Sequence, residues 1–470
     1  MAMLGKRRPS RSAPDKPRVK ASDRAASSGP GVEILRLAHD GRGVARSACG
    51  KTLFVDHALP GERVEVAVHR SRKRFDEAHL RDVLAPSPQR VEPSCQHFGQ
   101  CGGCDLQHLA LEGQREHKRA VLIEQLARQG IETGIAPELL AASGEGYRRR
   151  ARLGVKVDAQ GQVHLGFRAR HSHHLVDIHH CTILVPELAR LLVPLHRLLA
   201  GLEAPRQVGH IELLASETGP CLVVRQLRDN PVDADRWRAF AADHEVALGW
   251  LVGRETPQLS WLTAMPDLHY TLVSGVHELV LGFAPGDFLQ VGAEINQRLV
   301  DTALDWLMPT HGERVLDLFA GVGNFSLALA VQAAEVTAVE GNPVMVARLA
   351  DNARRNELEH VSARQADLSR EQTLEEMSPN GVDLVVLDPP REGAEAVCHW
   401  LAGSAVPRIL YISCDPATLA RDAAQLVQGG YRITRSAVAD MFPHTAHLES
   451  MLLFERATTR DIKGGRLEHG

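Results

Sequence analysis

The pattern of hydrophobic and polar residues changes along this chain in a way that separates three regions. Short alternating segments with glycine turns begin at Val32 and predict a small, OB-like β-barrel over residues 31–84. Residues 85–275 mix strand-like and helix-like segments and predict a central α+β domain. In residues 276–470 apolar strands alternate with helices, which is typical of a doubly wound, Rossmann-like parallel sheet. The predicted fold class is therefore α/β.

Outside these three patterns, four shorter segments have compositions or end signals that indicate their structure. Residues 1–30 are rich in Lys, Arg, Ser, Pro and Gly and are expected to form a disordered basic tail. Residues 82–88 (DVLAPSP) are interpreted as a linker after the barrel. An amphipathic helix is expected over 109–129, and Gly130 should end it. Basic residues 70–74 are interpreted as an exposed hairpin tip where RNA could dock.

Composition limits the class of protein. The chain has 470 residues, of which 44% are hydrophobic and 24% charged, as in ordinary globular domains. No apolar run is long enough to span a bilayer, and the basic start lacks the apolar core of a signal peptide. We therefore expect a cytoplasmic protein without membrane contact, whose eight cysteines are reduced, metal-bound or catalytic. The net charge of −4 argues against a protein that coats nucleic acid indiscriminately.

A glycine loop in residues 316–324 (LDLFAGVGN) follows a predicted strand and opens a helix. Such a loop lets the backbone approach a nucleotide-like ligand, and its spacing indicates S-adenosylmethionine rather than a dinucleotide. Asp317 can oppose a cationic sulfonium amino acid, Glu340 is placed for ribose hydroxyls, and Asp367 for adenine. The alternative is a structural turn in an unrelated doubly wound protein.

Asp388 and Cys414 follow predicted strands at the same rim, and Glu449 lies further along the chain. Asp388 begins the segment 388–391 (DPPR), Cys414 precedes an Asp-Pro break, and Glu449 closes the segment 442–449. A thiolate at Cys414 could add to C6 of a uracil, and Glu449 could then remove the C5 proton after methylation. Such a base must leave its stack to be reached. The alternatives are a buried structural cysteine and an amino-group methyltransferase that uses Asp388.

Three cysteines, Cys95, Cys101 and Cys104, are spaced C-x5-C-x2-C and predict a metal site, with Cys181 as a possible fourth ligand. His97 or His108 could instead complete a zinc site, whereas four cysteines would suit a [4Fe-4S] cluster. The remaining thiols, Cys49, Cys221 and Cys398, have no such neighbours, and the histidine-rich stretch around residues 171–180 is expected to be an exposed loop.

These motifs resemble the bacterial RNA uracil-5-methyltransferases, and within that family the enzymes that modify 23S ribosomal RNA. The likeness follows nearly the whole chain and is most specific in residues 413–419 (SCDPATL) and 440–449 (DMFPHTAHLE). It implies a TRAM RNA-binding barrel, a [4Fe-4S] cluster, and a class I S-adenosylmethionine methyltransferase domain on which the helix within 106–130 could pack. It implies Cys414 as nucleophile and Glu449 as proton acceptor. The other implied sites are donor contacts at Gln290, Phe319, Asn324, Glu340, Asp367 and Asp388, cluster ligands at Cys95, Cys101, Cys104 and Cys181, and a base contact at Phe288.

Two positions depart from the family pattern: Gly292 and Asp367 each stand where asparagine is usual. The resemblance implies 23S rRNA as the partner of a monomeric enzyme. A uridine in transfer RNA or elsewhere in ribosomal RNA stays an alternative, as does a non-catalytic RNA-binding protein with an iron-sulfur cluster.

Overall fold

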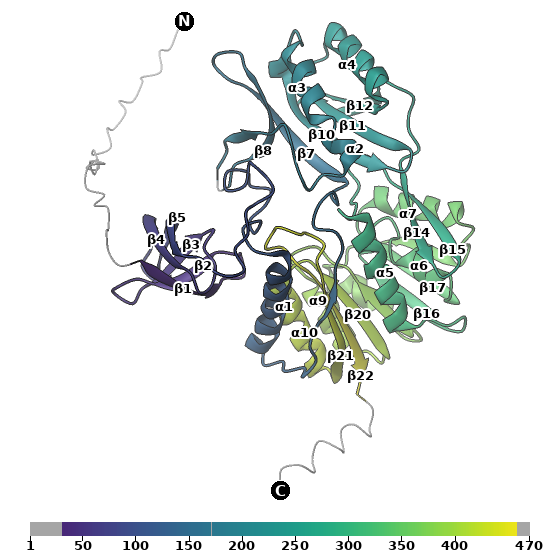
Figure 1. Cartoon of the computed structure of the whole chain (residues 1–470). Helices are drawn as coiled ribbons and strands as arrows, with labels where there is room; N and C mark the ends of the chain where they lie inside the picture. The colour runs from purple at the N-terminus through teal and green to yellow at the C-terminus, as the bar shows by residue number, and fades with distance from the viewer. Residues whose placement is uncertain (1–30, 171, 458–470) are drawn as a thin grey trace, which may run out of the picture.

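A computed structural model describes residues 31–170 and 172–457. It contains a small barrel, a central domain and a larger catalytic domain (Figure 1). The expected basic tail, residues 1–30, lies outside the described residues. Within the described ranges, no helix is long and apolar enough to cross a membrane.

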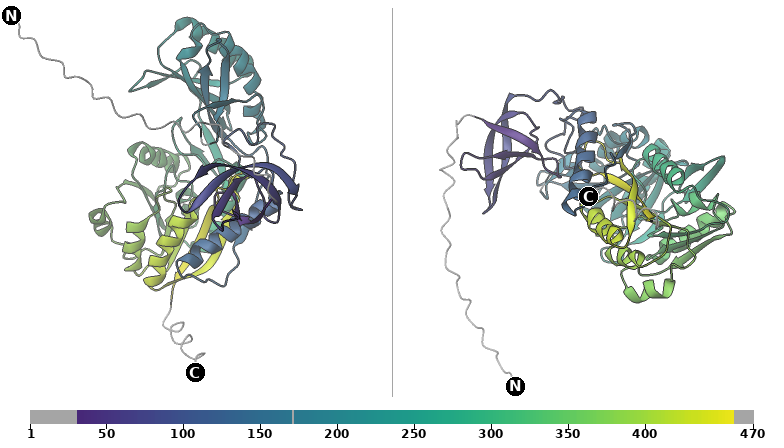
Figure 2. Two further views of the ribbon diagram at one scale, coloured as in Figure 1. Left: turned by 90° about the vertical axis from the view of Figure 1, so that its left-hand side faces the viewer. Right: turned by 90° about the horizontal axis from the view of Figure 1, so that it is seen from below.

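The barrel is closed by five strands in the order β1-β2-β3-β5-β4. Their bounds are β1 Val32–Leu37, β2 Gly43–Arg46, β3 Thr52–Asp56, β4 Arg63–Ser71 and β5 Phe75–Ala85. Alternate apolar residues such as Ile34, Leu53 and Val64 fill its interior, as a strand period of two requires. Figure 2 shows the barrel as a separate body beside α1.

Two expectations for the barrel had different outcomes. The basic residues 70–74 do lie at the exposed turn between β4 and β5. The linker expected at residues 82–88 is wrong in its first half, because β5 runs on to Ala85 and pairs with β4 there. The register pairs Val83 with Val64, a barrel-core residue. This long-range pairing overrides the local turn signal of the prolines.

The central domain is a seven-stranded sheet in the order β13-β12-β11-β10-β7-β8-β9. Its strands are β7 Arg150–Val157, β8 Val163–Arg168, β9 Leu175–Asp177, β10 Val208–Ser216, β11 Gly219–Gln226, β12 Ala247–Val252 and β13 Gln258–Trp261. Its helices are α2 Pro186–Ala189, α3 Leu192–Ala200, the 3-10 turn η1 Pro205–Gln207 and α4 Pro231–His244. Trp237 of α4 and leucines of α3 pack on the sheet to form its core.

The catalytic domain is built on an eight-stranded sheet in the order β18-β17-β16-β19-β20-β22-β21-β6. The strands are β16 Arg314–Leu318, β17 Glu335–Glu340, β18 Val361–Gln365, β19 Leu384–Leu387, β20 Arg408–Ser413, β21 Tyr431–Ala439, β22 Glu449–Arg456 and β6 Glu138–Leu140. The helices are α5 Ala293–Leu307, α6 Ser326–Ala330, α7 Pro343–Arg355, α8 Glu371–Met377, α9 Glu395–Ala402 and α10 Pro416–Gln428. The sheet is mixed rather than purely parallel, because β22 runs antiparallel to β20 and β21.

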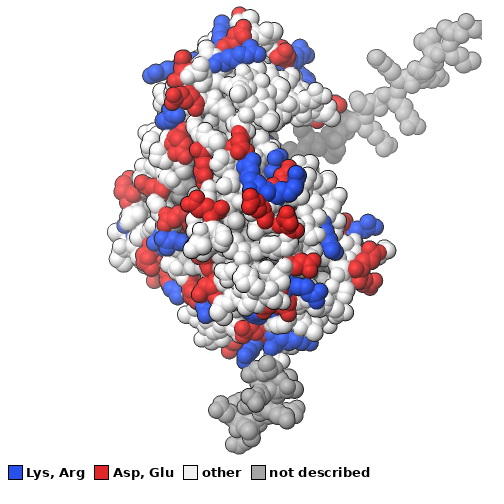
Figure 3. Space-filling model, turned by 90° about the vertical axis from the view of Figure 1, so that its right-hand side faces the viewer, with Lys and Arg blue, Asp and Glu red and all other residues white. Residues whose placement is uncertain are grey.

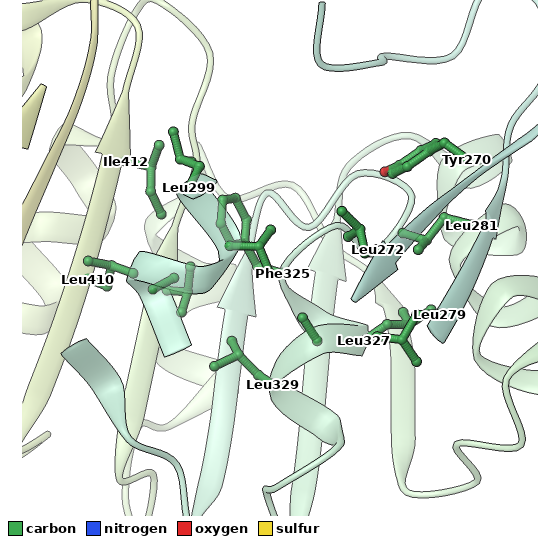
Figure 4. Packing of buried hydrophobic residues seen from close by; sticks show 14 of the residues in the cluster. Tyr270, Leu272, Leu279, Leu281, Leu299, Phe325, Leu327, Leu329, Leu410 and Ile412 are labelled. Carbon is green, nitrogen blue, oxygen red and sulfur yellow. The ribbon is translucent and has the colours of Figure 1, made fainter. Parts of the chain in front are cut away.

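A two-stranded hairpin, β14 His269–Ser274 and β15 His277–Gly282, packs on the catalytic domain. Its Leu272 and Leu281 share one apolar cluster with Phe325 and Ile412 (Figure 4). The expected domain boundary at 275/276 falls in the turn of this hairpin. Both strands contribute to this cluster, which also includes Leu214 and Val223 of β10 and β11.

The helix α1, Leu111–Arg128, precedes the central sheet in sequence but packs on the catalytic domain, beside α10. Its Val121, Leu122 and Leu126 enter the same apolar cluster as Leu419 and Tyr411. The strand β6 that follows adds to the edge strand β21. The region expected as one central domain, 85–275, is therefore divided between two cores.

Candidate active site and cysteine pocket

The glycine loop after β16 has the backbone that its sequence predicts. Phe319 adopts φ 65°, Gly321 58° and Gly323 98°. A side chain on Gly323 would meet Leu327 at 2.4 Å, so this turn needs glycine. Positive φ is unfavourable for a phenylalanine and is typical of functional loops. The loop opens the crevice where the parallel strands end, which is the usual ligand position in such sheets.

Two carboxylates, Asp317 and Asp388, stand at adjacent strand ends in this crevice. Asp317 is buried, its Oδ2 accepts a hydrogen bond from Ser326 Oγ, and its Oδ1 has no protein partner. Burial raises the pKa of Asp317 to about 7. Burial, followed by the charge of Asp317, also raises the pKa of Asp388. An acidic pair of this kind, buried at Asp317 and half-buried at Asp388, favours a cationic ligand, because a positive charge would compensate the carboxylates.

The ribose and adenine positions expected from sequence lie at the ends of β17 and β18. Glu340 accepts hydrogen bonds from the backbone N–H of Gly321 at 3.1 Å and of Asn342 at 2.8 Å. It therefore holds the glycine loop in place and keeps further lone pairs for a ligand. Asp367 is exposed, and hydrogen bonds from Ser369 lower its pKa. At this departure from the family pattern the side chain is an anion.

The segment that carries Phe288 and Gln290 lies between the hairpin and α5. Gln290 is buried and its carbonyl accepts a hydrogen bond from Arg149 Nε at 2.7 Å, whereas Phe288 is 59% exposed. An exposed aromatic ring beside the crevice suits stacking on a base. Gly292 is the N-cap of α5, and a side chain there would meet Ile295 at 2.9 Å.

Asn324 is mostly committed to contacts within the protein. Its Oδ1 accepts hydrogen bonds from Tyr270 OH at 3.0 Å and Asn296 Nδ2 at 2.9 Å, and its Nδ2 donates to Asn296 Oδ1 at 3.0 Å. One N–H of the Asn324 amide is left for a ligand. Tyr270 belongs to β14 and Asn296 to α5, so the hairpin and α5 both position the glycine loop.

Cys414 and Glu449 come together through strand register. The antiparallel pair β20–β22 aligns Ser413 with Ser450, so the next residue along each strand brings Cys414 opposite Glu449. Asp415 caps α10 by accepting hydrogen bonds from two backbone N–H groups, and Pro416 is its first residue. This cap turns the chain directly after Cys414. The thiol is half-buried, and Glu449 is buried.

The electrostatics of this pair resist ionisation in the resting site. Burial, followed by the charge of Glu449, raises the pKa of Cys414 to about 11. Burial, followed by Asp388, raises the pKa of Glu449 well above its usual value. Arg391 opposes both shifts, and no role for it was inferred from the sequence. Its carbonyl accepts a hydrogen bond from Thr418 of α10 at 3.1 Å, which fixes its loop beside the thiol.

The loop that leads to Glu449 is fastened to α1 and to the cysteine segment. Lys118 Nζ donates to Asp440 Oδ1 at 2.7 Å and to the carbonyl of Phe442 at 2.9 Å. The carbonyl of His444 accepts from the backbone N–H of Asp105 at 2.8 Å and of Leu106 at 2.9 Å. Asp105 directly follows Cys104. The base and the cysteine segment are therefore mechanically connected, which the sequence did not reveal.

Cys95, Cys101, Cys104 and Cys181 line one pocket between the cysteine segment and the central sheet. No three of these four described sulfurs lie within 4.8 Å of one another. A tetrahedral zinc would hold its sulfurs about 3.8 Å apart, as Zn–S bonds of about 2.3 Å require. The wider spacing fits a larger iron-sulfur cluster. His97 also lines the pocket, whereas His108 does not.

Burial disfavours ionisation of Cys101, Cys104 and Cys181. Burial raises the pKa of Cys101 to about 11 and that of Cys104 to about 12. A bound metal or cluster would have to displace these protons, as metal binding to thiolates normally does. The buried thiols and their position fit such a group, and they contribute nothing to the crevice around Cys414.

Known proteins match this chain along its length. The family profile described as tRNA (Uracil-5-)-methyltransferase matches residues 111–457, and that of the TRAM domain matches residues 31–80. The chain belongs to the RNA uracil-5-methyltransferase family. A family member from Chromohalobacter salexigens, named 23S rRNA (uracil(1939)-C(5))-methyltransferase RlmD, is 61% identical over 467 residues, 98% of this chain and 97% of that protein. One of the same name from Halomonas elongata is 58% identical over 469 residues, with 97% of each chain covered.

The fold of the family is also seen in a solved structure. The tRNA (uracil-54, C5)-methyltransferase of Pyrococcus abyssi, crystallised with S-adenosyl-L-homocysteine, is 24% identical and superposes with a TM-score of 0.71. It covers 91% of this chain, and this chain covers all of it. The predicted combination of a TRAM barrel and a methyltransferase domain in an uracil-5-methyltransferase is confirmed.

Proposed function

We propose that this enzyme transfers a methyl group from S-adenosylmethionine to C5 of one uridine in 23S ribosomal RNA, the position numbered 1939 in the names of its relatives. The observation that carries the chemistry is the register that sets Cys414 opposite Glu449. A nucleophile and a base on neighbouring strands can act on two adjacent atoms of one ring, C6 and C5. An amino-group methyltransferase would need neither of them.

S-adenosylmethionine, when bound in the crevice, supplies an electrophilic methyl group. Asp317 and Asp388 favour its positive charge, and Glu340 and Asp367 are placed for its ribose and adenine. Gln290, Phe319 and Asn324 are proposed as further contacts of the donor. The roles of the acidic residues rest on their positions at or near the ends of β16, β17, β18 and β19.

The chain's own residues then act on the uridine. The sulfur of Cys414 forms a bond to C6, and the electron pair of the C5–C6 double bond moves toward the O4 carbonyl. The resulting nucleophilic C5 takes the methyl group, whose bond to the sulfonium sulfur breaks, so that S-adenosylhomocysteine leaves. The carboxylate of Glu449 removes the C5 proton, the C5–C6 double bond reforms, and the C6–S bond breaks to release the thiolate. The raised pKa of Glu449 makes it, once ionised, a stronger base than an ordinary carboxylate.

Arg391 is placed to favour the thiolate that starts this sequence, because its cation lowers the pKa of Cys414. A bound sulfonium would act in the same direction. The target base must be flipped out of its stack to enter the crevice, and Phe288 could stack on it. The TRAM barrel and its basic hairpin tip are proposed to hold the surrounding RNA.

Figure 3 shows Lys and Arg interspersed with Asp and Glu on the side of the molecule opposite the barrel. Such a mixed surface offers the RNA backbone no continuous basic area. All groups of the site come from one chain, and we propose a monomer acting in the cytoplasm.

The cysteine pocket is proposed to hold a [4Fe-4S] cluster through Cys95, Cys101, Cys104 and Cys181. The supporting observations are the four convergent thiols and their wide spacing. The proposed role of the cluster is to fix the cysteine segment, whose Asp105 and Leu106 hold the loop that leads to Glu449.

The substrate is tested by mapping 5-methyluridine in a strain that lacks this protein. We expect loss at one 23S rRNA position and its restoration by the purified enzyme with S-adenosylmethionine. Unchanged 23S rRNA with loss in transfer RNA would instead support the alternative substrate.

A further inference from the structure

Four side chains of the central domain converge at the edge of the sheet formed by β8 and β9. Asp177 ends β9, His179 follows it, His164 lies on β8 and His196 lies on α3. We propose that these residues form a second metal site, for a divalent cation of the zinc class, which adjoins the cysteine pocket at Ile178 and His180 but uses none of its thiols.

The ligand atoms are already close to one another. His196 Nε2 lies 2.7 Å from Asp177 Oδ1, and His179 Nε2 lies 3.5 Å from Asp177 Oδ2. One ligand atom from each of these three residues falls within a common span of 4.8 Å. The fourth residue, His164, has its Nδ1 3.8 Å from Asp177 Oδ2.

Two of the histidines have a contact that orients the ring at the nitrogen facing away from Asp177. His196 Nδ1 lies 2.8 Å from the carbonyl oxygen of Leu192, which can only accept, so Nδ1 carries the proton. His164 Nε2 lies 3.2 Å from the carboxylate of Asp158. If each ring carries a single proton on this far nitrogen, the nitrogen that faces Asp177 has a lone pair for a metal. Metal-binding histidines are typically fixed by such an acceptor on the far nitrogen.

The carboxylate is fixed as well. Asp177 Oδ1 accepts a hydrogen bond from the backbone N–H of Leu165 at 2.8 Å. Lone pairs that converge on a carboxylate repel one another unless a cation or protons lie between them. The simpler alternative to a metal ion is a proton between His196 and Asp177, which would make them an ion pair. The experiment must distinguish a bound metal from this proton.

Ligand chemistry selects the class of metal. Imidazole nitrogen with one carboxylate suits zinc and its neighbours, whereas magnesium and calcium prefer oxygen. Because His179 is 54% exposed, the site is open to solvent on one side. A metal here would tie β9 to α3 and so stiffen the segment that leads to Cys181.

The test uses the full-length protein purified without oxygen, with its iron content measured. Zinc is titrated against a competing chromogenic chelator, and X-ray absorption at the zinc edge reports the ligand type. Zinc–nitrogen bonds of about 2.0 Å differ from zinc–sulfur bonds of about 2.3 Å, so the two pockets are separable. The variant is His179→Ala, chosen because this exposed side chain can be removed without disturbing the core.

We expect one zinc equivalent with nitrogen and oxygen ligands in the wild type, and at least about a tenfold loss of its affinity in His179→Ala. His173→Ala is the matched control, because His173 is an exposed histidine outside the cluster, and it should bind zinc as the wild type does. Asp177→Asn, checked for folding by circular dichroism, should also lose this equivalent. Zinc bound only through sulfur, or equal affinity in wild type and His179→Ala, would overturn the second site. Methyl transfer is not the readout, so this result is independent of the proposed function.

Discussion

Lys118 Nζ lies 2.7 Å from Asp440 Oδ1, and both side chains are fully buried. This pair joins α1 to the loop that delivers Glu449. Arg115 Nε also reaches Asp440, at 3.1 Å, so one carboxylate holds two cations of the same helix. The loop that leads to Glu449, the proposed base, is therefore positioned by a segment more than three hundred residues earlier in the chain.

Lys118→Met should destabilise the protein by about 3 kcal/mol. The reason is that only Arg115 then remains to compensate the buried charge of Asp440. Urea unfolding measures this loss. Arg119→Met, on the same helix, removes only a pair with exposed Glu116 and should cost less than about 1 kcal/mol. Equal losses of stability in the two variants would show that the buried pair contributes no more to stability than the exposed pair.

Cys414→Ala should abolish methyl transfer, with a loss of at least about a thousandfold, because C5 is not nucleophilic without the bond to C6. The measurement is transfer of labelled methyl groups to 23S rRNA. Cys49→Ser, at an exposed thiol of the barrel, is the control and should keep full activity. Retained activity in Cys414→Ala would favour the amino-group methyltransferase.

Glu449→Gln should trap the enzyme on its RNA, because methylation can proceed while the C5 proton cannot be removed. The covalent complex is visible as a band of low mobility on a denaturing gel. The double variant Cys414→Ala with Glu449→Gln should form no band. Free turnover by Glu449→Gln would assign the base to another residue.

Asp317 predicts a pH dependence of stability. Its pKa is raised to about 7 in the folded protein, against about 4 in the unfolded chain. The contribution of Asp317 to the free energy of unfolding is complete below about pH 4. It is lost as the pH rises through 7, because the buried carboxyl group must then ionise. Asp317→Asn should therefore gain stability relative to wild type between pH 5 and pH 8, as followed by urea unfolding.

Asp317→Asn should also bind S-adenosylmethionine less well, since it lacks the anion that opposes the sulfonium. Binding of the neutral S-adenosylhomocysteine should change less. Calorimetric titration of both ligands checks this difference, and an equal change for the two would remove Asp317 from the sulfonium site.

Protein purified without oxygen should be brown and contain about four iron atoms per chain, as a [4Fe-4S] cluster requires. Cys104→Ser should lose colour and iron, whereas Cys221→Ser, at a buried thiol of β11 outside the cysteine pocket, should keep both. Colourless wild-type protein with one zinc bound through the four sulfurs would contradict the cluster.

Local sequence determined much of this protein. Alternation with short turns predicted the barrel, and the glycine loop predicted the ligand crevice, because these features depend on the conformations that a few adjacent residues allow. Chemistry-bearing residues at predicted strand ends, such as Cys414 and Asp388, were identifiable because parallel strands expose their carboxyl ends on one edge.

Tertiary structure alone decided what distant segments do together. The antiparallel β22, the addition of β6 at the sheet edge and the place of α1 come from pairings between segments far apart in sequence. Hydrophobic periodicity says which face of a helix or strand is buried, but not which surface covers it. The register that sets Glu449 opposite Cys414 and the buried contact of Lys118 with Asp440 arise only when those surfaces meet.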